Sequence, residues 1–194
     1  TTLAEDYGRL SASLEMRAML QSGDERKLVA LKAVDPAWPL VGAAELGSGG
    51  QLAAALADGS IVVDPQMARA LELVAGTKVR IGDAELTVAD TLGYEPDRSV
   101  SFVTFGPRVL MSTATLEATG LNRPSAMITH RTRLLLDRQE DRVAAVSALR
   151  GLAETNGVRV RDLMDAAPGF DVFIDRTEVF LVLVGLTALL IGGL

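Results

Sequence analysis

The last stretch of the chain, Val179 to Leu194, carries no charged residue over 16 consecutive positions. A helix that spans a bilayer needs roughly 20 apolar residues, whereas runs of about 10–14 are more typical of core helices. Thr187 is the only side chain in this run that can form a hydrogen bond, so the run has no polar stripe to face water. The sequence therefore favours a membrane helix and leaves a buried core helix as the alternative.

The flanks of this run support the membrane interpretation. Asp175 and Glu178 have the spacing of a capping box, which predicts that the helix begins near Arg176. Ala188 and Gly192 would let another membrane helix approach closely. Few Lys or Arg residues precede the run, which places the folded domain on the non-cytoplasmic side. The predicted span consists of Val179, Phe180, Leu181, Val182, Leu183, Val184, Gly185, Leu186, Thr187, Ala188, Leu189, Leu190, Ile191, Gly192, Gly193 and Leu194.

Composition limits the class of the remaining chain. Charged residues make up 23% of the sequence, a share typical of globular proteins. The net charge of −6 argues against nucleic acid as a partner, because phosphate binding needs a basic surface. The chain has no Cys, which excludes disulfides, thiol nucleophiles and thiolate zinc sites.

Alternating apolar residues predict a strand over 14–20. The run 28–34 is mostly apolar on both faces, which predicts a second strand inside a sheet, joined to the first by a turn at Gly23-Asp24. Further on, the patterns predict strands at 60–64, 78–81, 84–92, 101–106 and 108–112. Short helices are expected over 51–57, 65–73 and 113–121, the second starting at Asp64-Pro65 and the third ending at Gly120. The Gly-rich segment 47–50 is expected to be a flexible loop.

A β-α-β unit is predicted towards the end of the chain, with a strand at 127–136, a helix at 137–156 and a second strand from 158 to 164. Acidic residues at the helix start suggest a capped end, and Gly157 is expected to stop the helix. The predicted fold class is thus α+β with two lobes. A porter-like α/β lobe comprises 1–40 and 125–175, an inserted mostly-β lobe comprises 41–124, and 176–194 forms a truncated transmembrane helix.

Residues that might carry chemistry form no enzyme signature. His130 is the only histidine and has no companion at the spacing of metal ligands, so we expect a structural role. Asp137, Glu140 and Asp141 are explained as an acidic helix start. The cluster Arg131, Arg133, Arg138 and Arg142 is interpreted as a solvated face, with contact to anionic lipid or a partner as the alternative. We expect no catalytic, metal-binding or cofactor-binding residue.

One segment is more specific. Leu28–Gly42 resembles the start of the extracytoplasmic domain of FtsX-like/MacB-like ABC transporter permeases, in particular their YbbP-type branch. The branch more often has Tyr where Trp38 stands. Segments around 61–92 and 176–194 are similar to further family patterns, so the resemblance spans about residues 14–194. The matching motif residues, which we expect to be structural, are Lys32, Ala33, Val34, Asp35, Trp38, Pro39, Leu40 and Gly42.

The resemblance implies the first extracytoplasmic domain of a permease in the bacterial cytoplasmic membrane. It would couple ATP-driven motion of the membrane helices to export or extraction of a hydrophobic or lipid-linked substrate. The implied partners are the bilayer, the remaining permease helices, a cytoplasmic ABC ATPase subunit that binds the ATP, and a periplasmic protein. Two other hypotheses remain at this point: a membrane-anchored binding or adaptor module without transport activity, and a membrane-tethered hydrolase that uses His130.

Overall fold

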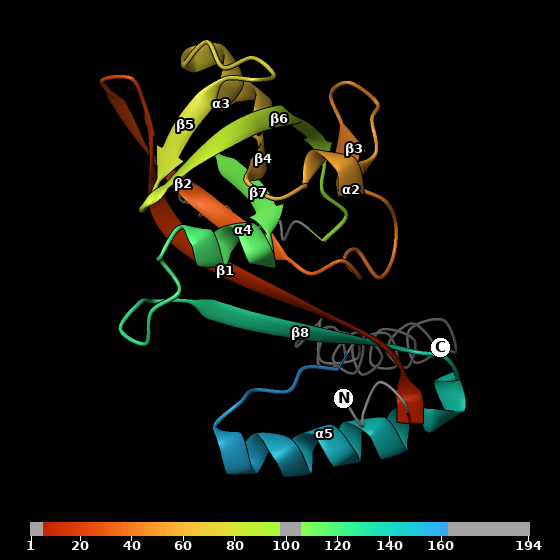
Figure 1. The fold of residues 1–194 in the computed structure, drawn as a ribbon. Helices are drawn as coiled ribbons and strands as arrows, with labels where there is room; N and C mark the ends of the chain where they lie inside the picture. Colours follow the sequence, from red (N-terminus) through yellow and green to blue (C-terminus); the bar gives the residue numbers. More distant parts are fainter. Residues whose placement is uncertain (1–5, 98–105, 163–194) are drawn as a thin grey trace, which may run out of the picture. The chain divides into compact units, whose positions relative to one another are not determined.

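The computed structural model describes residues 6–97 and 106–162. These residues fall into two compact units, divided between Arg138 and Gln139. The first unit is built from strands with short helices at their connections (Figure 1). Its strands are β1 (Gly8–Ser22), β2 (Glu25–Val34), β3 (Glu45–Leu46), β4 (Ser60–Val63), β5 (Lys78–Ile81), β6 (Ala84–Tyr94), β7 (Arg108–Ser112) and β8 (Thr129–Leu136).

The sheet closes on itself. Neighbouring strands follow the order β2–β7–β4–β6–β5–β1–β8, and β1 also pairs with β2. This last pairing joins the two ends of the path β2 to β1, so these strands form a barrel (Figure 1). The pairs β2–β7 and β4–β6 are parallel, and the other pairs of the ring are antiparallel. Closure gives each of these strands two neighbours and removes the free edges of an open sheet.

The predicted hairpin at the start of the barrel is confirmed, but its first strand is longer than predicted. Ser22 pairs with Glu25 across the two-residue turn, and Gly23 has a φ of 56°, the left-handed value that this turn requires. β1 starts at Gly8 rather than near Leu14 because its first half pairs with β8, from Gly8 opposite Leu136 to Glu15 opposite Thr129. The local apolar alternation gave no sign of this pairing.

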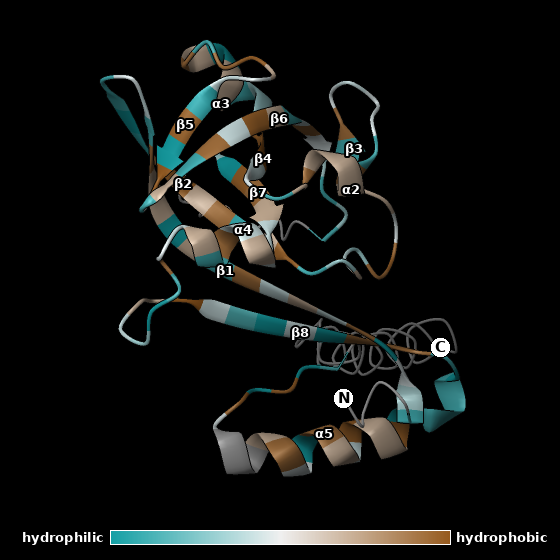
Figure 2. Cartoon of the chain, in the orientation of Figure 1, coloured by the Kyte–Doolittle hydropathy of each residue, from teal (hydrophilic) through white to brown (hydrophobic). Residues whose placement is uncertain are grey.

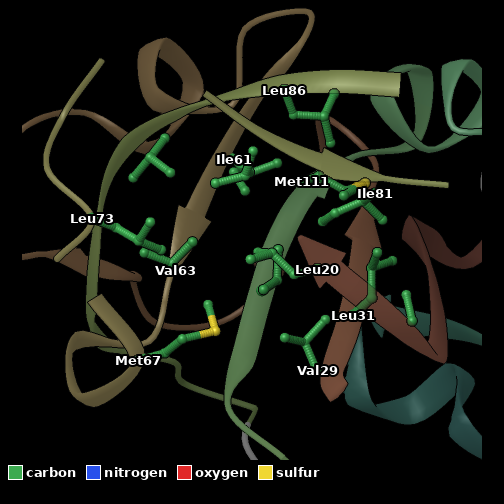
Figure 3. Packing of buried hydrophobic residues seen from close by; sticks show 14 of the residues in the cluster. Leu20, Val29, Leu31, Ile61, Val63, Met67, Leu73, Ile81, Leu86 and Met111 are labelled. Carbon is green, nitrogen blue, oxygen red and sulfur yellow. The ribbon is translucent and has the colours of Figure 1, made fainter. Parts of the chain in front are cut away.

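The barrel interior holds the main hydrophobic core. Alternate residues of the strands point inward, as Figure 3 shows for Leu20, Leu31, Ile61, Ile81 and Met111. All five are completely buried. A core of this kind, packed from all sides of a ring, resists deformation because its side chains interdigitate with few voids.

Two short helices add apolar side chains to this core. Helix α3 (Pro65–Ala70) begins at Asp64, whose carboxylate accepts hydrogen bonds from the backbone N–H groups of Gln66 and Met67, as the cap prediction required. It ends at Ala70, earlier than predicted. Helix α4 (Thr113–Ala118) is capped by Ser112 and buries Leu116. Gly120, with a φ of 65°, lies beyond its end as predicted.

A second, smaller apolar cluster lies on the outer side of the barrel wall. It consists of Val34, Trp38, Leu46, Leu56, Val62, Leu92 and Leu110, with part of helix α2 (Leu52–Ala55) packed against it. Helix α2 is shorter than the predicted 51–57. The central strands are therefore apolar on both faces, which explains the brown stretches of β2 in Figure 2. The exception on the outer face of β2 is Lys32.

The Gly-rich loop before α2 is held by hydrogen bonds. The carboxylate of Asp90 accepts from the backbone N–H of Ser48 and from its hydroxyl group. Gly47 N–H donates to the carbonyl of Thr91 at 2.8 Å. A Cβ on Gly47 would lie 2.1 Å from Thr91 Oγ1, so the Thr91 side chain would have to move to make room for it.

The second unit contains a 3₁₀ turn (Gln139–Asp141) followed by helix α5 (Arg142–Asn156). The helix starts later than the predicted Asp137, and Asp141 makes no side-chain capping hydrogen bond, so the prediction of a capped acidic start was wrong. Gly157 ends the helix with φ 65° and ψ 26°, as predicted. Residues 158–162 are not in a strand, so the predicted strand from 158 is wrong in its described part.

Three predictions remain untested. Two concern segments outside the described residues, and the third concerns the boundaries of the two lobes. The strand expected at 101–106 and the span Val179–Leu194 fall largely or wholly outside the described residues. Among the residues that the model describes, no helix is long and apolar enough to cross a membrane. The division into lobes at 40/41 and 124/125 stays a prediction, although β1 and β2 share one barrel with β4–β7.

Candidate functional site: a buried charge cluster on the barrel wall

Lys32 lies near the C-terminal end of β2, and its side chain has a relative exposure of 0%. Its neighbours Leu31 and Ala33 point into the barrel, so Lys32 points outward. The outer wall is covered at this point by Trp38 and by Glu95, Pro96 and Asp97, which follow β6. A buried ammonium group is costly unless it is paired, so the covering residues decide whether the fold tolerates it.

The ammonium group of Lys32 is fully paired. Lys32 Nζ lies 2.8 Å from Glu95 Oε1 and 2.5 Å from Asp97 Oδ1. The same nitrogen lies 4.5 Å from the centre of the Trp38 ring, within the range of a cation–π interaction. Three segments of the chain are thus joined at one atom.

Further cations complete the cluster. Arg108, the first residue of β7, donates from Nε to Glu95 Oε2 at 3.0 Å. Arg133 on β8 places Nη1 2.7 Å from Asp97 Oδ2, and Trp38 Nε1 donates to the same oxygen at 3.0 Å. We name Lys32, Trp38, Glu95, Asp97, Arg108 and Arg133 the charge cluster. Each carboxylate oxygen in it has a donor.

The pKa of the Asp97 carboxyl depends on two opposing effects, its burial and its cationic and hydrogen-bonding neighbours. Burial raises the pKa of its carboxyl, but hydrogen bonds from Lys32 and Trp38 and the charges of Lys32 and Arg133 outweigh this, so the pKa lies below its ordinary value. The cluster therefore holds an ionised carboxylate in a half-buried place. With each carboxylate oxygen engaged by donors, this arrangement suits a clamp between strands rather than proton transfer.

Asp35, the acidic residue of the motif, forms a second junction. Its carboxylate accepts from Ser11 Oγ at 2.8 Å and from the backbone N–H of Ala12 at 2.6 Å. Its own N–H donates to the carbonyl of Ala12 at 3.2 Å. The end of β2 is thereby tied to β1 at the place where β1 continues towards β8.

The remaining motif residues shape the chain after β2. The bond between Trp38 and Pro39 is cis. Gly42 has a φ of 77°, and a Cβ there would lie 3.1 Å from Pro96, so the loop packs closely on the segment that covers Lys32. Val34 lies in the outer apolar cluster, Ala33 is buried inside the barrel, and Leu40 is half-buried. The motif thus supplies two members of the charge cluster, Lys32 and Trp38, and Gly42 packs against Pro96 beside it.

The other candidate residues do not converge on a site. His130 is exposed on β8, and no group of metal-binding side chains occurs within 6–97 and 106–162. Arg131 lies 3.5 Å from Glu15, and Arg142 pairs with Asp162 at 2.5 Å. Both arginine side chains are paired within their own units and remain about two-fifths exposed, at 44% and 39%. Figure 2 shows the hydrophilic colour over the first part of β8.

Glu95, Asp97 and Arg108 are the members of the cluster that sequence reasoning missed. Glu95 follows the end of β6 and Arg108 opens β7, in segments with no recognisable motif. The only available signal was Lys32 itself, a lysine in an otherwise apolar strand, which requires an acidic partner somewhere in the fold.

Known proteins with similar sequence or structure identify the kind of domain. No family model matches the chain. An uncharacterized ABC transporter permease, YbbP of Escherichia coli K12, is 29% identical over 123 residues. The match covers 63% of this chain, which spans only 15% of that relative's length.

Solved structures agree on the fold. The periplasmic region of MacB from Actinobacillus actinomycetemcomitans aligns with a TM-score of 0.56 at 17% identity, over 81% of this chain and 72% of that one. The extracellular domain of the noncanonic ABC-type transporter YknZ from Gram-positive bacteria gives a TM-score of 0.57 at 11% identity, over 81% and 82%. The chain therefore has the mixed α/β fold of MacB-like extracytoplasmic domains, and the resemblance to FtsX-like/MacB-like ABC transporter permeases that its Lys32–Gly42 motif predicted is confirmed.

Proposed function

We propose that this chain is the extracytoplasmic domain of an ABC transporter permease in the bacterial cytoplasmic membrane. The observation that carries the proposal is the sequence match to a permease over 123 residues, on a chain whose fold is that of the MacB periplasmic region. The proposed role is transport and not catalysis. No cofactor is assigned to this chain, because ATP would bind to the ABC ATPase subunit on the cytoplasmic side.

The membrane part of the proposal rests on the sequence. Val179–Leu194 would form the start of a transmembrane helix that packs on the remaining permease helices through Ala188 and Gly192. The domain would consist of a porter-like lobe from both chain ends and an inserted lobe. A periplasmic protein is a further proposed partner.

The proposed physical role is mechanical coupling. ATP-driven displacement of the membrane helices would reach the extracytoplasmic domain and open or close a path for a hydrophobic or lipid-linked substrate, a hinge or shear transition. The closed barrel and its charge cluster support this role, because a body that does not deform passes displacement on instead of absorbing it.

Membrane topology is the first test. These 194 residues contain no Cys, so an introduced thiol is the only one in this part of the permease. Met127→Cys, at a side chain that is 96% exposed, should react in intact cells with a maleimide that cannot cross the cytoplasmic membrane. Thr187→Cys, in the proposed span, is the matched control and should stay unlabelled. Labelling of Met127→Cys only after lysis would refute the extracytoplasmic location.

Coupling is tested by distance measurements on the permease assembled with its ATPase. Spin labels at Met127→Cys and Val158→Cys lie in different units and at exposed positions. The distance between them should change between the nucleotide-free and vanadate-trapped states. A control pair within the first unit, Met127→Cys and Val41→Cys, should not change. The adaptor hypothesis expects no change in either pair.

A further inference from the structure

The first half of β1 and β8 form a two-stranded ribbon beyond the barrel. β2 pairs with β1 only from Ser13 onward, whereas β8 pairs with it from Gly8 to Glu15. Over residues 8–12 the ribbon therefore consists of β1 and β8 alone within the described part of the chain. An isolated pair of strands is marginally stable in water, so contacts between this ribbon and the barrel would stabilise it.

Two carboxylates stand at the base of this ribbon. Asp35 holds its β1 strand through Ser11 and Ala12, as described above. Asp97 holds its β8 strand through Arg133, which lies directly opposite Ser11 in the register. Both strands of the ribbon are thus bound by a carboxylate at paired positions of the register. Asp97 in turn forms an ion pair with Lys32 of the barrel.

Arg133 differs from the other two cations of the cluster, because the cluster is already neutral without it. Lys32 and Arg108 already balance Glu95 and Asp97. Arg133 is the additional cation, and its side chain is 37% exposed, against 0% for Lys32 and 10% for Arg108. Removing Arg133 would therefore leave the buried part of the cluster paired and neutral. Arg133 is not needed to neutralise the cluster, and its contact joins β8 to it.

We infer that Arg133 is a positioning residue that locks the β1–β8 ribbon onto the barrel through Asp97, so that ribbon and barrel move as one rigid lever. The lock is a property of this unit alone. The use of the lever in transport rests on the proposed function.

Hydrogen exchange on the full chain tests the lock. Arg133→Gln should raise exchange about fivefold in β8 and residues 8–12, the factor that corresponds to about 1 kcal/mol for a partly exposed ion pair. Exchange in β4 and β7 should stay unchanged. Arg133→Lys keeps the charge without the guanidinium fork and should fall between the wild type and Arg133→Gln. Arg123→Gln, which removes the exposed pair with Asp83, is the control and should leave the ribbon unchanged.

Two exchange results would overturn the lock. One is unchanged protection of β8 in Arg133→Gln. The other is equal acceleration in all strands, which would show a general loss of stability instead of a local release.

The lever is tested separately with spin labels at Arg9→Cys on the ribbon and Val74→Cys on the barrel, both exposed positions. In the assembled permease their distance should be narrow and the same with and without trapped nucleotide. It should broaden in Arg133→Gln. A nucleotide-dependent distance in the wild type would refute the rigid lever. If instead the Met127–Val158 distance does not respond to nucleotide, the proposed coupling fails while the lock still stands.

Discussion

Lys32 Nζ lies 2.8 Å from Glu95 Oε1, and the two side chains have relative exposures of 0% and 1%. The residues are separated by 63 positions in the sequence, so this contact joins the C-terminal part of β2 to the segment after β6. Taking either charge out of water costs several kcal/mol, and only the partner charges offset that cost. The relationship makes the stability of the barrel depend on both residues.

Replacing Lys32 by Met should destabilise the domain by about 3–5 kcal/mol, because Glu95 and Asp97 would lose a buried counter-charge. Urea unfolding followed by the fluorescence of Trp38, the only tryptophan, measures the change next to the mutated site. Lys78→Met is the matched control. Lys78 also pairs with a glutamate, Glu85, but the two side chains are 66% and 53% exposed, so no measurable change is expected. A loss below about 1 kcal/mol for Lys32→Met, as for a surface pair, would contradict the clamp.

The stability of the domain should fall in acid partly through Asp97. Its pKa in the folded state is below the ordinary aspartate value of about 3.9, so the unfolded chain binds a proton first as the pH decreases. This contribution is complete above about pH 4 and is lost as the pH falls through the folded-state pKa. Asp97→Asn lacks it. Urea unfolding across this range should show the difference between wild type and Asp97→Asn shrinking towards acid, and a constant difference would contradict the assignment.

Features that depend on neighbouring residues could be predicted from the sequence. The turn at Gly23-Asp24 and the capped start at Asp64-Pro65 both occur as expected. Each is specified within a few positions, by a residue that tolerates left-handed backbone or by a side chain that reaches the next N–H groups. The Lys32–Gly42 motif was visible through its resemblance to a known family, but the buried pairing of Lys32 was not predicted.

Features that depend on distant pairing could not be predicted. The parallel pairing of β2 with β7 closes the barrel and brings Arg108 beside Lys32, but nothing local in either strand selects that neighbour. The same holds for the long first half of β1, which forms because β8 is available to pair with it. Alternation alone also misjudged Val158–Asp162, where apolar and basic residues alternate without a strand.

Ser13 should tolerate loss of its hydroxyl group. The side chain is 2% exposed, and its Oγ has no hydrogen-bond partner among the described residues. A buried hydroxyl without a partner costs about 1–3 kcal/mol of desolvation. Ser13→Ala should therefore leave stability unchanged or raise it by about 1 kcal/mol. Ser11→Ala is the control, because Ser11 donates to Asp35 and its loss should destabilise. A destabilised Ser13→Ala in thermal unfolding would show that the hydroxyl has a partner.

Replacing Gly23 or Gly82 by Ala should distinguish the cost of backbone strain from the cost of a steric clash. Both open two-residue hairpin turns before an aspartate, with φ values of 58° and 56°. A Cβ on Gly23 meets nothing within 4 Å, so Gly23→Ala should cost only the left-handed strain of about 1–2 kcal/mol. A Cβ on Gly82 would lie 2.3 Å from the carbonyl oxygen of Thr119, which also accepts the Asp83 N–H. Because that clash displaces the end of α4, Gly82→Ala should cost clearly more in urea unfolding. Equal costs for the two variants would show that the chain after α4 can move away from the turn without loss.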